Sequence, residues 1–318
     1  MTEFEFIDHL KVKYHLTSIG DDCAVLPKDA ENDLLVTTDM LVEDVDFRLA
    51  WTTPAFLGHK VLAVSLSDIA AMGGVPEWAL TSIAIPEKLW KSDLLDQFYC
   101  GWHQLAEHHH VQLIGGDISK TDGKLTIDST MLGSVPTGKA VLRAGARPGD
   151  AIFVTGYLGG AAAGLKLLES GTRFDDDLPA PVKHLLFRQL QPLPQIKTAI
   201  LLQTQSIATS MIDISDGLSS DISHIAKASG VGARLDRRQI PIDPAIGSVF
   251  PDQSENIDLA LHGGEDFELL ITVAEKNFSA VADLGFHHIG EITANRGVIE
   301  LSDGAGTVPL DAKGYTHF

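Results

Sequence analysis

Short apolar runs alternate with longer helical patterns along the first 145 residues. Residues 34–37 form a compact apolar run that predicts a buried strand. Pro54 suits the first turn of a helix, which we expect to reach Met72 and to stop at the two glycines that follow. The same patterns predict strands at 79–85, 111–114 and 125–135, and a helix over 94–108.

The second half of the chain shows the same mixture, so both halves are predicted to be α/β (α+β). A helix is expected from about 217 to 228, because Leu218, Ile222 and Ile225 recur at helical spacing before Gly230. The other clear patterns are a strand at 151–155, a helix over 161–168 and a strand at 269–273. A turn-rich stretch separates the halves, and we predict two domains, 1–145 and 146–318.

The composition is that of an ordinary globular protein. The chain has 318 residues, of which 44% are hydrophobic and 21% are charged, so a sizeable core can be buried. No run of 18 or more apolar residues occurs, and no membrane partner is expected. The acidic N-terminus does not resemble a signal peptide. Cys23 and Cys100 fit no zinc or redox spacing, so we expect a cytoplasmic location.

The formal net charge of −19 narrows the possible partners. It argues against nucleic acid, because nucleic-acid binding requires a basic surface. It would also repel phosphate-bearing ligands, unless some carboxylates hold divalent cations. Mg²⁺ binds in that way, through carboxylates together with substrate phosphate oxygens. A solvated acidic surface is the alternative interpretation of the same charge, and the positions of the acids must decide between the two.

Several acidic motifs follow one pattern, in which an apolar segment ends and small or hydroxyl residues carry an acid in the turn. The first is Gly-Asp-Asp at 20–22, where Asp22 is a candidate metal ligand or part of a plain turn. The second is Thr37, Thr38 and Asp39 at the end of an apolar strand. Their oxygens suit a hard cation, and the alternative is an Asx turn.

A third acid lies inside a predicted helix. Asp68 continues the stripe of Val61 and Val64 by helical spacing, which places a carboxylate in line with the apolar face. A buried and unpaired charge is costly, so a cation or ligand is expected beside it. The alternative is a structural ion pair with a basic residue such as Lys60.

Two further motifs place acids where strands end. Gly116 and Asp117 directly follow a predicted strand, and glycine lets the backbone approach phosphate oxygens while the aspartate ligates the accompanying cation. Asp213, Ser215 and Asp216 lie where a strand meets a helix. They could hold Mg²⁺ while helix N–H groups meet phosphate, or Ser215 or Asp216 could simply cap the helix.

The complete set of motifs favours phosphoryl transfer without a P-loop. No G-x-x-x-x-G-K-[ST] sequence and no protein-kinase signature occurs. A further acidic motif of the kind described above, Gly-Gly-Glu-Asp, stands at 263–266. Phosphoryl transfer mainly requires positioning and charge neutralisation, which bound cations can supply. Three contiguous histidines at 108–110 point in different directions on a helix, so we expect them on the surface.

The motifs taken together resemble thiamine-monophosphate kinase, in the superfamily that includes aminoimidazole ribonucleotide synthetase. The matching segments are 20–26, 37–41, 62–73, 113–117, 143–150, 212–217, 263–268 and 313–318. The resemblance implies a two-domain aminoimidazole ribonucleotide synthetase-like fold. In it, residues 1–145 would form the ATP- and Mg²⁺-binding and dimerisation domain, and residues 146–318 an α/β domain that completes the substrate site.

The resemblance also implies an activity. The γ-phosphate of ATP would pass to thiamine monophosphate, giving thiamine diphosphate and ADP. Transfer would be direct and in line, with several Mg²⁺ ions and no covalent nucleophile. The protein would be a homodimer in which the N-terminal domains pair and nucleotide lies in the cleft they form.

Site residues carry over where this sequence matches the family's motifs. The positions that match Mg²⁺ sites are Asp22, Thr37, Thr38, Asp39, Asp68, Asp117, Asp213 and Asp216. The positions that match nucleotide contacts are Tyr99, Gly116, Asp117, Arg143 and Ser215. The positions that match or face the substrate are Asp46, Glu265 and Tyr315. An arginine suits phosphate oxygens, and a tyrosine suits a cationic thiazolium ring.

Two positions depart from the family pattern. Thr37 stands where serine is common and keeps the hydroxyl oxygen. Asp46 stands where histidine is common, which reverses the possible charge of a residue facing the substrate.

Two alternative functions stay open. One is another ATP-dependent enzyme of the superfamily. Against it, Cys23 lies within an acidic motif unlike the reactive position of a selenophosphate synthetase, and the chain ends His317-Phe318 where the hydrogenase-maturation relative ends in cysteine. The other is a non-catalytic nucleotide-binding relative, which would be expected to have lost ligands.

Overall fold

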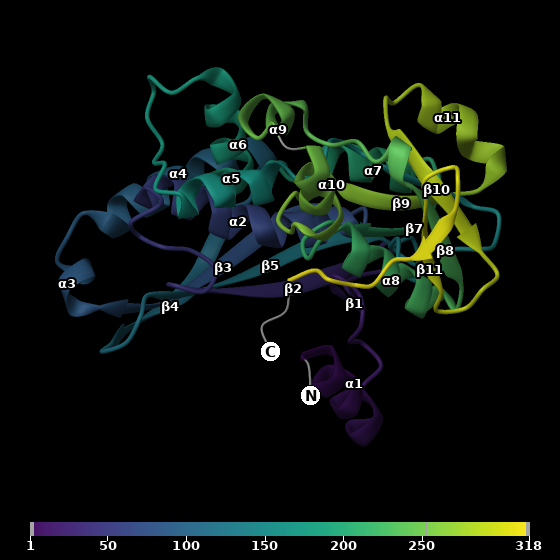
Figure 1. Ribbon diagram of the computed structural model, residues 1–318. Helices are drawn as coiled ribbons and strands as arrows, with labels where there is room; N and C mark the ends of the chain where they lie inside the picture. Colours follow the sequence, from purple (N-terminus) through teal and green to yellow (C-terminus); the bar gives the residue numbers. More distant parts are fainter. Residues whose placement is uncertain (1–2, 252, 316–318) are drawn as a thin grey trace.

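The computed structural model describes residues 3–251 and 253–315, and the terminal residues 316–318 of the matching segment lie outside it (Figure 1). The N-terminal half builds a five-stranded sheet in the order β1-β2-β5-β3-β4. Its strands are β1 (Ala24–Pro27), β2 (Asn32–Val42), β3 (Val75–Pro86), β4 (Gln112–Thr121) and β5 (Thr126–Pro136). Only the β3–β4 pair is parallel. The helices are α1 (Glu3–Tyr14), α2 (Pro54–Ala71), α3 (Glu87–Trp90) and α4 (Leu94–His109).

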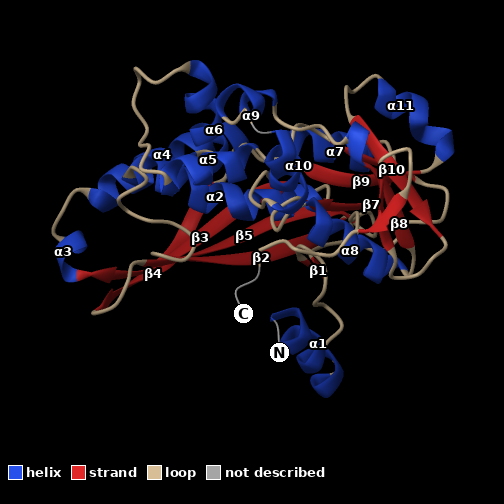
Figure 2. Cartoon of the chain, viewed as in Figure 1, coloured by secondary structure: helices blue, strands red, loops and turns tan. Residues whose placement is uncertain are grey.

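The two faces of this sheet differ. Along β2, Leu35, Thr37 and Leu41 are buried, whereas Thr38 and Met40 between them are exposed, as expected for alternating side chains. Helices α2 and α4 cover the face of the buried residues (Figure 2). The other face carries side chains such as Met40 at 61% exposure and Val75 at 47%. We call it the open face.

Helix α2 links the two halves. It is buried on nearly all sides, as a helix enclosed within a core should be. Thr53 caps its first turn by accepting a hydrogen bond from the amide of Phe56, and Pro54 follows as predicted. The core around α2 includes Ile196 of the C-terminal half and the strand residues Met211 and Ile271. Asp68, the one acidic residue of α2, can therefore meet residues of both halves.

The C-terminal half builds a seven-stranded sheet in the order β12-β11-β8-β10-β6-β9-β7. Its strands are β6 (Ala151–Val154), β7 (Ala208–Asp213), β8 (Gly232–Asp236), β9 (Leu269–Val273), β10 (His287–Thr293), β11 (Ile299–Ser302) and β12 (Thr307–Pro309). The α-helices are α5 (Gly160–Glu169), α6 (Ala180–Leu190), α7 (Ile196–Thr204), α8 (Leu218–Ser229), α9 (Pro244–Val249), α10 (Gln253–His262) and α11 (Phe278–Ala282). Short 3₁₀ turns are η1 (Arg237–Gln239) and η2 (Glu275–Asn277).

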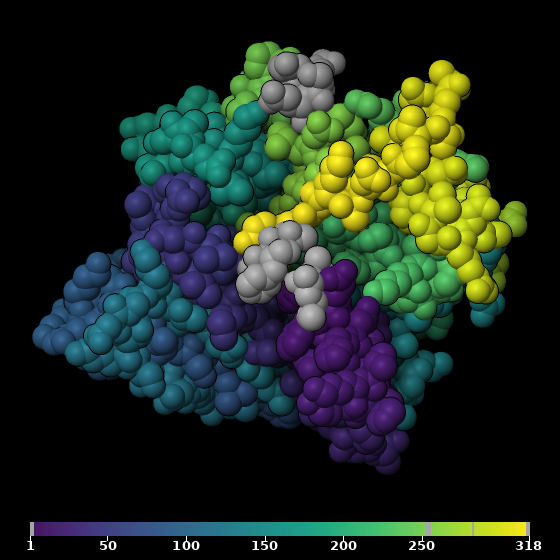
Figure 3. Space-filling model, turned by 60° about the horizontal axis from the view of Figure 1, so that its bottom comes forward, coloured from purple at the N-terminus to yellow at the C-terminus, as the bar shows by residue number. Residues whose placement is uncertain are grey.

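The strongly periodic elements of the sequence are confirmed within a few residues, including the predicted helices of α2, α4, α5 and α8. Helix α1 was not predicted from the sequence, and none of its residues is buried. It contacts α8 through the ion pair of Asp8 with Lys227, at 2.7 Å, and through Phe4 packing on His224. The space-filling view shows α1, in purple, at the surface of the molecule (Figure 3).

No helix in the described part of the chain is both long and apolar enough to cross a membrane.

Candidate functional site

Three carboxylates from distant segments converge where the two halves meet. Asp22 precedes β1, Asp68 lies on α2 and Asp213 ends β7. One carboxylate oxygen of each lies within 4.8 Å of one from the other two. The predicted convergence of acids is therefore present at these three positions.

Hydroxyl groups hold the carboxylates on the helix-covered side of the sheet. Ser67 donates a hydrogen bond to Asp213 at 2.5 Å, and Thr37 donates a short one to Asp68. Ser65 donates to Asp39 at 2.6 Å. The two serines are on α2 close to Asp68, and the sequence motifs did not single them out as site residues.

The cluster holds more negative charge than the chain neutralises. Arg143 forms a short ion pair with Oδ1 of Asp22. Burial raises the pKa of Asp213 to about 8, and the pKa of Asp68 lies well above its ordinary value because of burial and the neighbouring carboxylates. Burial also raises the pKa of Asp39, to about 6. These carboxylates lack sufficient positive charge from the protein itself.

The donor set fits a hard divalent cation such as Mg²⁺. Oδ2 of Asp22 is buried and has no hydrogen-bond partner in the described structure, although Arg143 occupies the other oxygen. Carboxylate and hydroxyl oxygens are the ligands that Mg²⁺ prefers. A buried carboxylate oxygen without a donor is costly, and a bound cation would remove that cost.

Two predicted metal ligands lie on the open face instead. Thr38 donates to the Asp128 carboxylate at 3.1 Å, which places its side chain opposite that of Asp39. Asp117 is exposed on the edge strand β4, and the register places it beside Ser82, the cross-strand neighbour of Asp128. Neither joins the carboxylate cluster within this chain.

Asp216 belongs to a second group of possible ligands, with Asp221 and His224 of α8. The alternative interpretation, in which Ser215 or Asp216 caps α8, is wrong, because the N-cap residue is Gly217. The Gly217 amide donates a hydrogen bond to the Asp221 carboxylate. Asp221 is buried, and its pKa is raised well above its ordinary value by burial and by the neighbouring acids. Neither Ser215 nor Asp216 is therefore the N-cap residue of α8.

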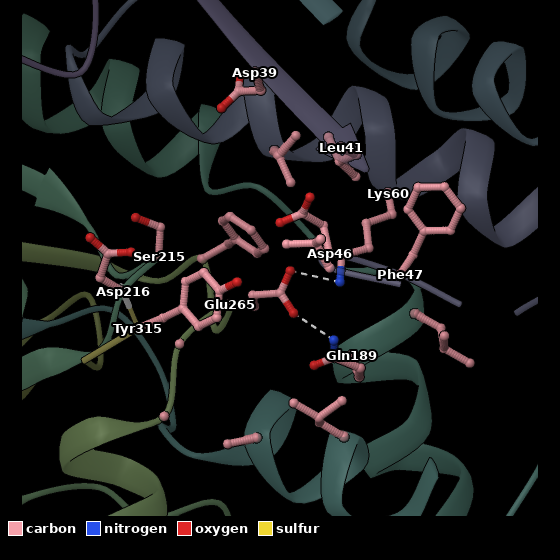
Figure 4. Close-up of a pocket in the computed structure, with 18 of the residues that line it drawn as sticks. Asp39, Leu41, Asp46, Phe47, Lys60, Gln189, Ser215, Asp216, Glu265 and Tyr315 are labelled. Atoms are coloured by element: carbon pink, nitrogen blue, oxygen red, sulfur yellow. Dashed lines mark hydrogen bonds and ion pairs between the residues drawn. The ribbon is translucent and has the colours of Figure 1, made fainter. Parts of the chain in front are cut away.

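A cavity of about 880 Å³ extends from the Asp39 and Asp216 region between the two halves. The predicted substrate residues Asp46, Glu265 and Tyr315 face a common space in this cavity, and Tyr315 lies beside Asp216 (Figure 4). Backbone bonds tie these parts together. The amide of Glu265 donates to the carbonyl of Ser215 at 2.8 Å, and that of Tyr315 donates to the carbonyl of Asp216 at 3.1 Å.

The ion pair expected as the alternative for Asp68 is absent. Lys60 instead pairs with Glu265, with Nζ 2.7 Å from Oε1. Gln189 of α6 donates to the other oxygen of Glu265 at 2.5 Å. Lys60 and Gln189 were not predicted to be site residues, because their partner comes from a loop far along the chain.

Some predicted nucleotide contacts have evident structural roles. Gly116 has φ of +150°, and a Cβ there would come within 1.9 Å of the carbonyl oxygen of Thr81, so the close approach to β3 requires glycine. Tyr99 packs against Phe98 and Trp102 on α4 and is not among the residues that line the cavity. Their nucleotide roles stay predictions.

The predicted surface histidines include one that is half-buried. His109 lines a second cavity of about 550 Å³, together with His59 and His108. Burial, His108 and the nearby Lys197 lower the pKa of His109 to about 4.

Comparisons with known proteins identify the family. Residues 20–135 match the family "AIR synthase related protein, N-terminal domain", and residues 147–301 match "AIR synthase related protein, C-terminal domain". The thiamine-monophosphate kinase of Escherichia coli O157:H7 is 40% identical over 311 residues, covering 94% of this chain and 91% of that protein. The chain belongs to the thiamine-monophosphate kinase family.

Other members of the thiamine-monophosphate kinase family match over their full length. The Bacillus subtilis (strain 168) protein is 35% identical over 330 residues, covering 100% of both chains. The solved structure of AaThiL complexed with AMPPCP and TMP has a TM-score of 0.88 at 33% identity, covering 100% of this chain and 97% of that one. The thiamine-monophosphate kinase structure from Stenotrophomonas maltophilia K279a gives 0.81 at 35% identity, covering 96% and 98%.

Proposed function

We propose that this protein transfers the γ-phosphate of ATP to thiamine monophosphate, forming thiamine diphosphate and ADP. The observation that carries the proposal is one continuous site in a chain of this family. The cluster of Asp22, Asp68 and Asp213 adjoins, through Asp39, a cavity of about 880 Å³. The AaThiL structure with AMPPCP and TMP supports both ligands.

The carboxylate cluster would hold the metal ions. Asp22, Asp39, Asp68 and Asp213 offer the helix-side oxygens, and Asp216 offers another at the start of α8. Bound Mg²⁺ would neutralise the phosphate oxygens, which is the main requirement of phosphoryl transfer. The serine and threonine donors on these carboxylates fix their orientation before any ligand arrives.

The cysteine beside the cluster is poorly suited to form a covalent intermediate. Cys23 is buried beside the acids, and burial together with Asp68 and Asp22 raises the pKa of its thiol well above the ordinary value. A neutral thiol is a poor nucleophile. We propose direct in-line transfer, as the family resemblance implies, in which the aspartates hold cations and form no bond to the phosphoryl group.

Arg143 and Ser215 are the polar residues best placed for nucleotide phosphates near the cluster. The Arg143 guanidinium already neighbours Asp22, and Ser215 lines the cavity beside Asp216. Gly116, Asp117 and Thr38 would contribute from the open face or its edge.

The space between Asp46, Glu265 and Tyr315 suits the ring system of thiamine monophosphate. The carboxylates of Asp46 and Glu265 face this space, and Tyr315 offers an aromatic surface for the thiazolium cation. Burial and the nearby carboxylates raise the pKa of Tyr315, so its hydroxyl stays neutral. One Asp46 oxygen accepts the amide of Val42 at 2.7 Å, which fixes its carboxylate at the cavity wall.

We further propose a homodimer formed through the open face, with 1–145 as the dimerisation domain and 146–318 completing the substrate site in the cytoplasm. Leu26, Met40 and Val75 are exposed apolar residues on this face or its edges. A contiguous exposed apolar patch marks an interaction surface, and we propose that these residues belong to one. Dimerisation would cover Thr38 and the edge near Asp117. Sedimentation at low and high protein concentration tests this assembly, and a monomer at every concentration would contradict it.

The decisive experiment measures ADP release in the presence of thiamine monophosphate, thiamine or aminoimidazole precursors, with and without Mg²⁺. We expect release only with thiamine monophosphate and Mg²⁺. Release with an aminoimidazole precursor would indicate another activity of the superfamily. ATP binding without any release would indicate a non-catalytic relative.

A further inference from the structure

The Glu265 carboxylate is held on both oxygens by side chains from two different helices. Lys60 of α2 lies 2.7 Å from Oε1, and Gln189 of α6 donates to Oε2 at 2.5 Å (Figure 4). The three residues line the cavity together. We refer to Lys60, Gln189 and Glu265 as the clamp.

The clamp is built from costly parts. Lys60 is only 4% exposed and Gln189 only 5%, so a charge and an amide are nearly removed from water. Glu265 has φ of +66°, a left-handed conformation that a non-glycine residue adopts at a cost. A structure that merely needed a turn here would do better with glycine. The arrangement therefore points to recognition.

One polar atom of the clamp has no partner. Gln189 donates through Nε2 to Glu265, which fixes the orientation of its amide, while its Oε1 is buried without a hydrogen-bond partner in the described structure. A buried acceptor without a donor is costly. A ligand donor that reached this atom, or displaced a neighbour to do so, would recover part of that cost.

Helix α2 sets the distance between the clamp and the metal cluster. Lys60 and Asp68 are on the same helix, and their separation of eight residues corresponds to about 12 Å at about 1.5 Å per residue. If the acceptor's phosphate lies near Asp68, the clamp therefore contacts the end of the acceptor that is farthest from the phosphate. In thiamine monophosphate that end is an aminopyrimidine, whose exocyclic amine donates hydrogen bonds.

The ion pair between Lys60 and Glu265 also determines whether the clamp recognises the charge of a ligand or its hydrogen-bond donors. Lys60 offsets the charge of Glu265, so the clamp offers acceptor oxygens with little net charge. The Asp46 carboxylate accepts the Val42 amide and faces the same cavity, where it offers a negative charge to the cationic ring. Charge and hydrogen-bond recognition are thus separated along the cavity.

We propose that Lys60 and Gln189 are positioning residues that aim Glu265 at the exocyclic amine of the acceptor, and that they set its specificity. This inference rests on the proposed function, and deepens it by assigning a specificity device to residues outside the predicted site. Neither residue acts on the transferring phosphate.

The test compares thiamine monophosphate with oxythiamine monophosphate, in which an oxo group replaces the amine. Gln189→Met removes the amide while keeping the side-chain length. We expect KM for thiamine monophosphate to rise about tenfold, with kcat and the KM for ATP unchanged. The preference for the amino compound in kcat/KM should fall by a similar factor.

Gln203→Met is the matched control, because Gln203 is another buried glutamine and lies in α7 outside the cavity lining. It should keep the wild-type preference. Lys60→Met removes the ion pair to Glu265 and tests the same point if Gln189→Met folds poorly. It should also lower the preference, because Oε1 of Glu265 loses the group that positions it.

Two results would count against these statements in distinguishable ways. If the wild-type protein phosphorylates thiamine monophosphate and a folded variant, Gln189→Met or Lys60→Met, keeps its preference, the clamp proposal is overturned alone. If the wild-type protein phosphorylates neither compound, the proposed function is overturned and the clamp proposal with it.

Discussion

Two groups of buried acids in this molecule differ in how far the protein neutralises their negative charge. In the C-terminal half, Asp266 and Glu268 are paired with Arg188, whose Nη1 lies 3.1 Å from Oε1 of Glu268. Asp266 also accepts the amides of Gly159 and Ala161 at the start of α5, at 2.6 and 3.1 Å. Here the protein itself supplies the compensating groups.

The cluster at the junction of the halves is left undercompensated. Asp22, Asp68 and Asp213 share one nearby guanidinium, from Arg143, and an oxygen of Asp22 has no donor. Burial raises the pKa of Asp213 to about 8, but that of Asp266 only to about 6 because Arg188 and two amides oppose the effect. Negative charge is thus neutralised where it is structural and left unbalanced where a ligand must bring the cation.

The largest expected effect comes from removing charge at the undercompensated cluster. Asp213→Asn should lower turnover by about 10³-fold, as loss of a key electrostatic group does, because one metal oxygen becomes a neutral amide. Without Mg²⁺ the variant should be at least as stable as the wild type, since like-charge repulsion falls. Turnover and thermal unfolding in EDTA measure the two effects, and near-normal turnover would contradict the metal role.

Breaking the compensated group should do the reverse. Arg188→Met leaves Asp266 and Glu268 buried without their cation, which typically costs about 3–5 kcal/mol. We expect this loss in urea unfolding, and Mg²⁺ should not restore it. A variant as stable as the wild type would show that the two groups do not differ as described.

The pH dependence of stability should expose the undercompensated cluster. The folded protein raises the pKa of Asp213 to about 8, compared with about 3.9 in the unfolded chain. Between these values the folded state binds more protons, so stability falls as pH rises. In EDTA, stability at pH 6 should exceed that at pH 8, by up to about 1.4 kcal/mol per pH unit for each such carboxylate.

Two controls sharpen this pH prediction. Mg²⁺ should flatten the slope, because a bound cation keeps the carboxylates ionised. Asp213→Asn should flatten it without Mg²⁺. A stability that rises from pH 6 to pH 8 in EDTA would have the wrong sign for the cluster.

The smallest expected effect lies at the cavity wall. Asp46→His introduces the residue that the family resemblance leads us to expect at this position, and turnover should change by less than about tenfold, the range of a single neutral hydrogen bond. The Val42 amide loses its carboxylate acceptor, so a modest loss of stability is also expected. Steady-state kinetics with thiamine monophosphate measure the change, and complete inactivity would show that the pocket depends on the carboxylate.

The sequence by itself determined the elements and the acids that matter most. The predicted strand at 34–37 and the helix that begins at Pro54 follow from apolar spacing and caps, which are local properties. Acids placed at strand ends, such as Asp39 and Asp213, could be recognised as candidates because the ends of strands carry ligands in α/β proteins.

Only the tertiary structure decided which of these acids meet. Thr37 and Thr38 belong to one motif, yet they lie on opposite faces of β2, and just one face is covered by α2. Lys60 pairs with Glu265 and not with Asp68, because the loop after α10 folds back over α2. Such contacts join segments far apart in the chain, and their balance of burial and charge is set by packing, which no local pattern encodes.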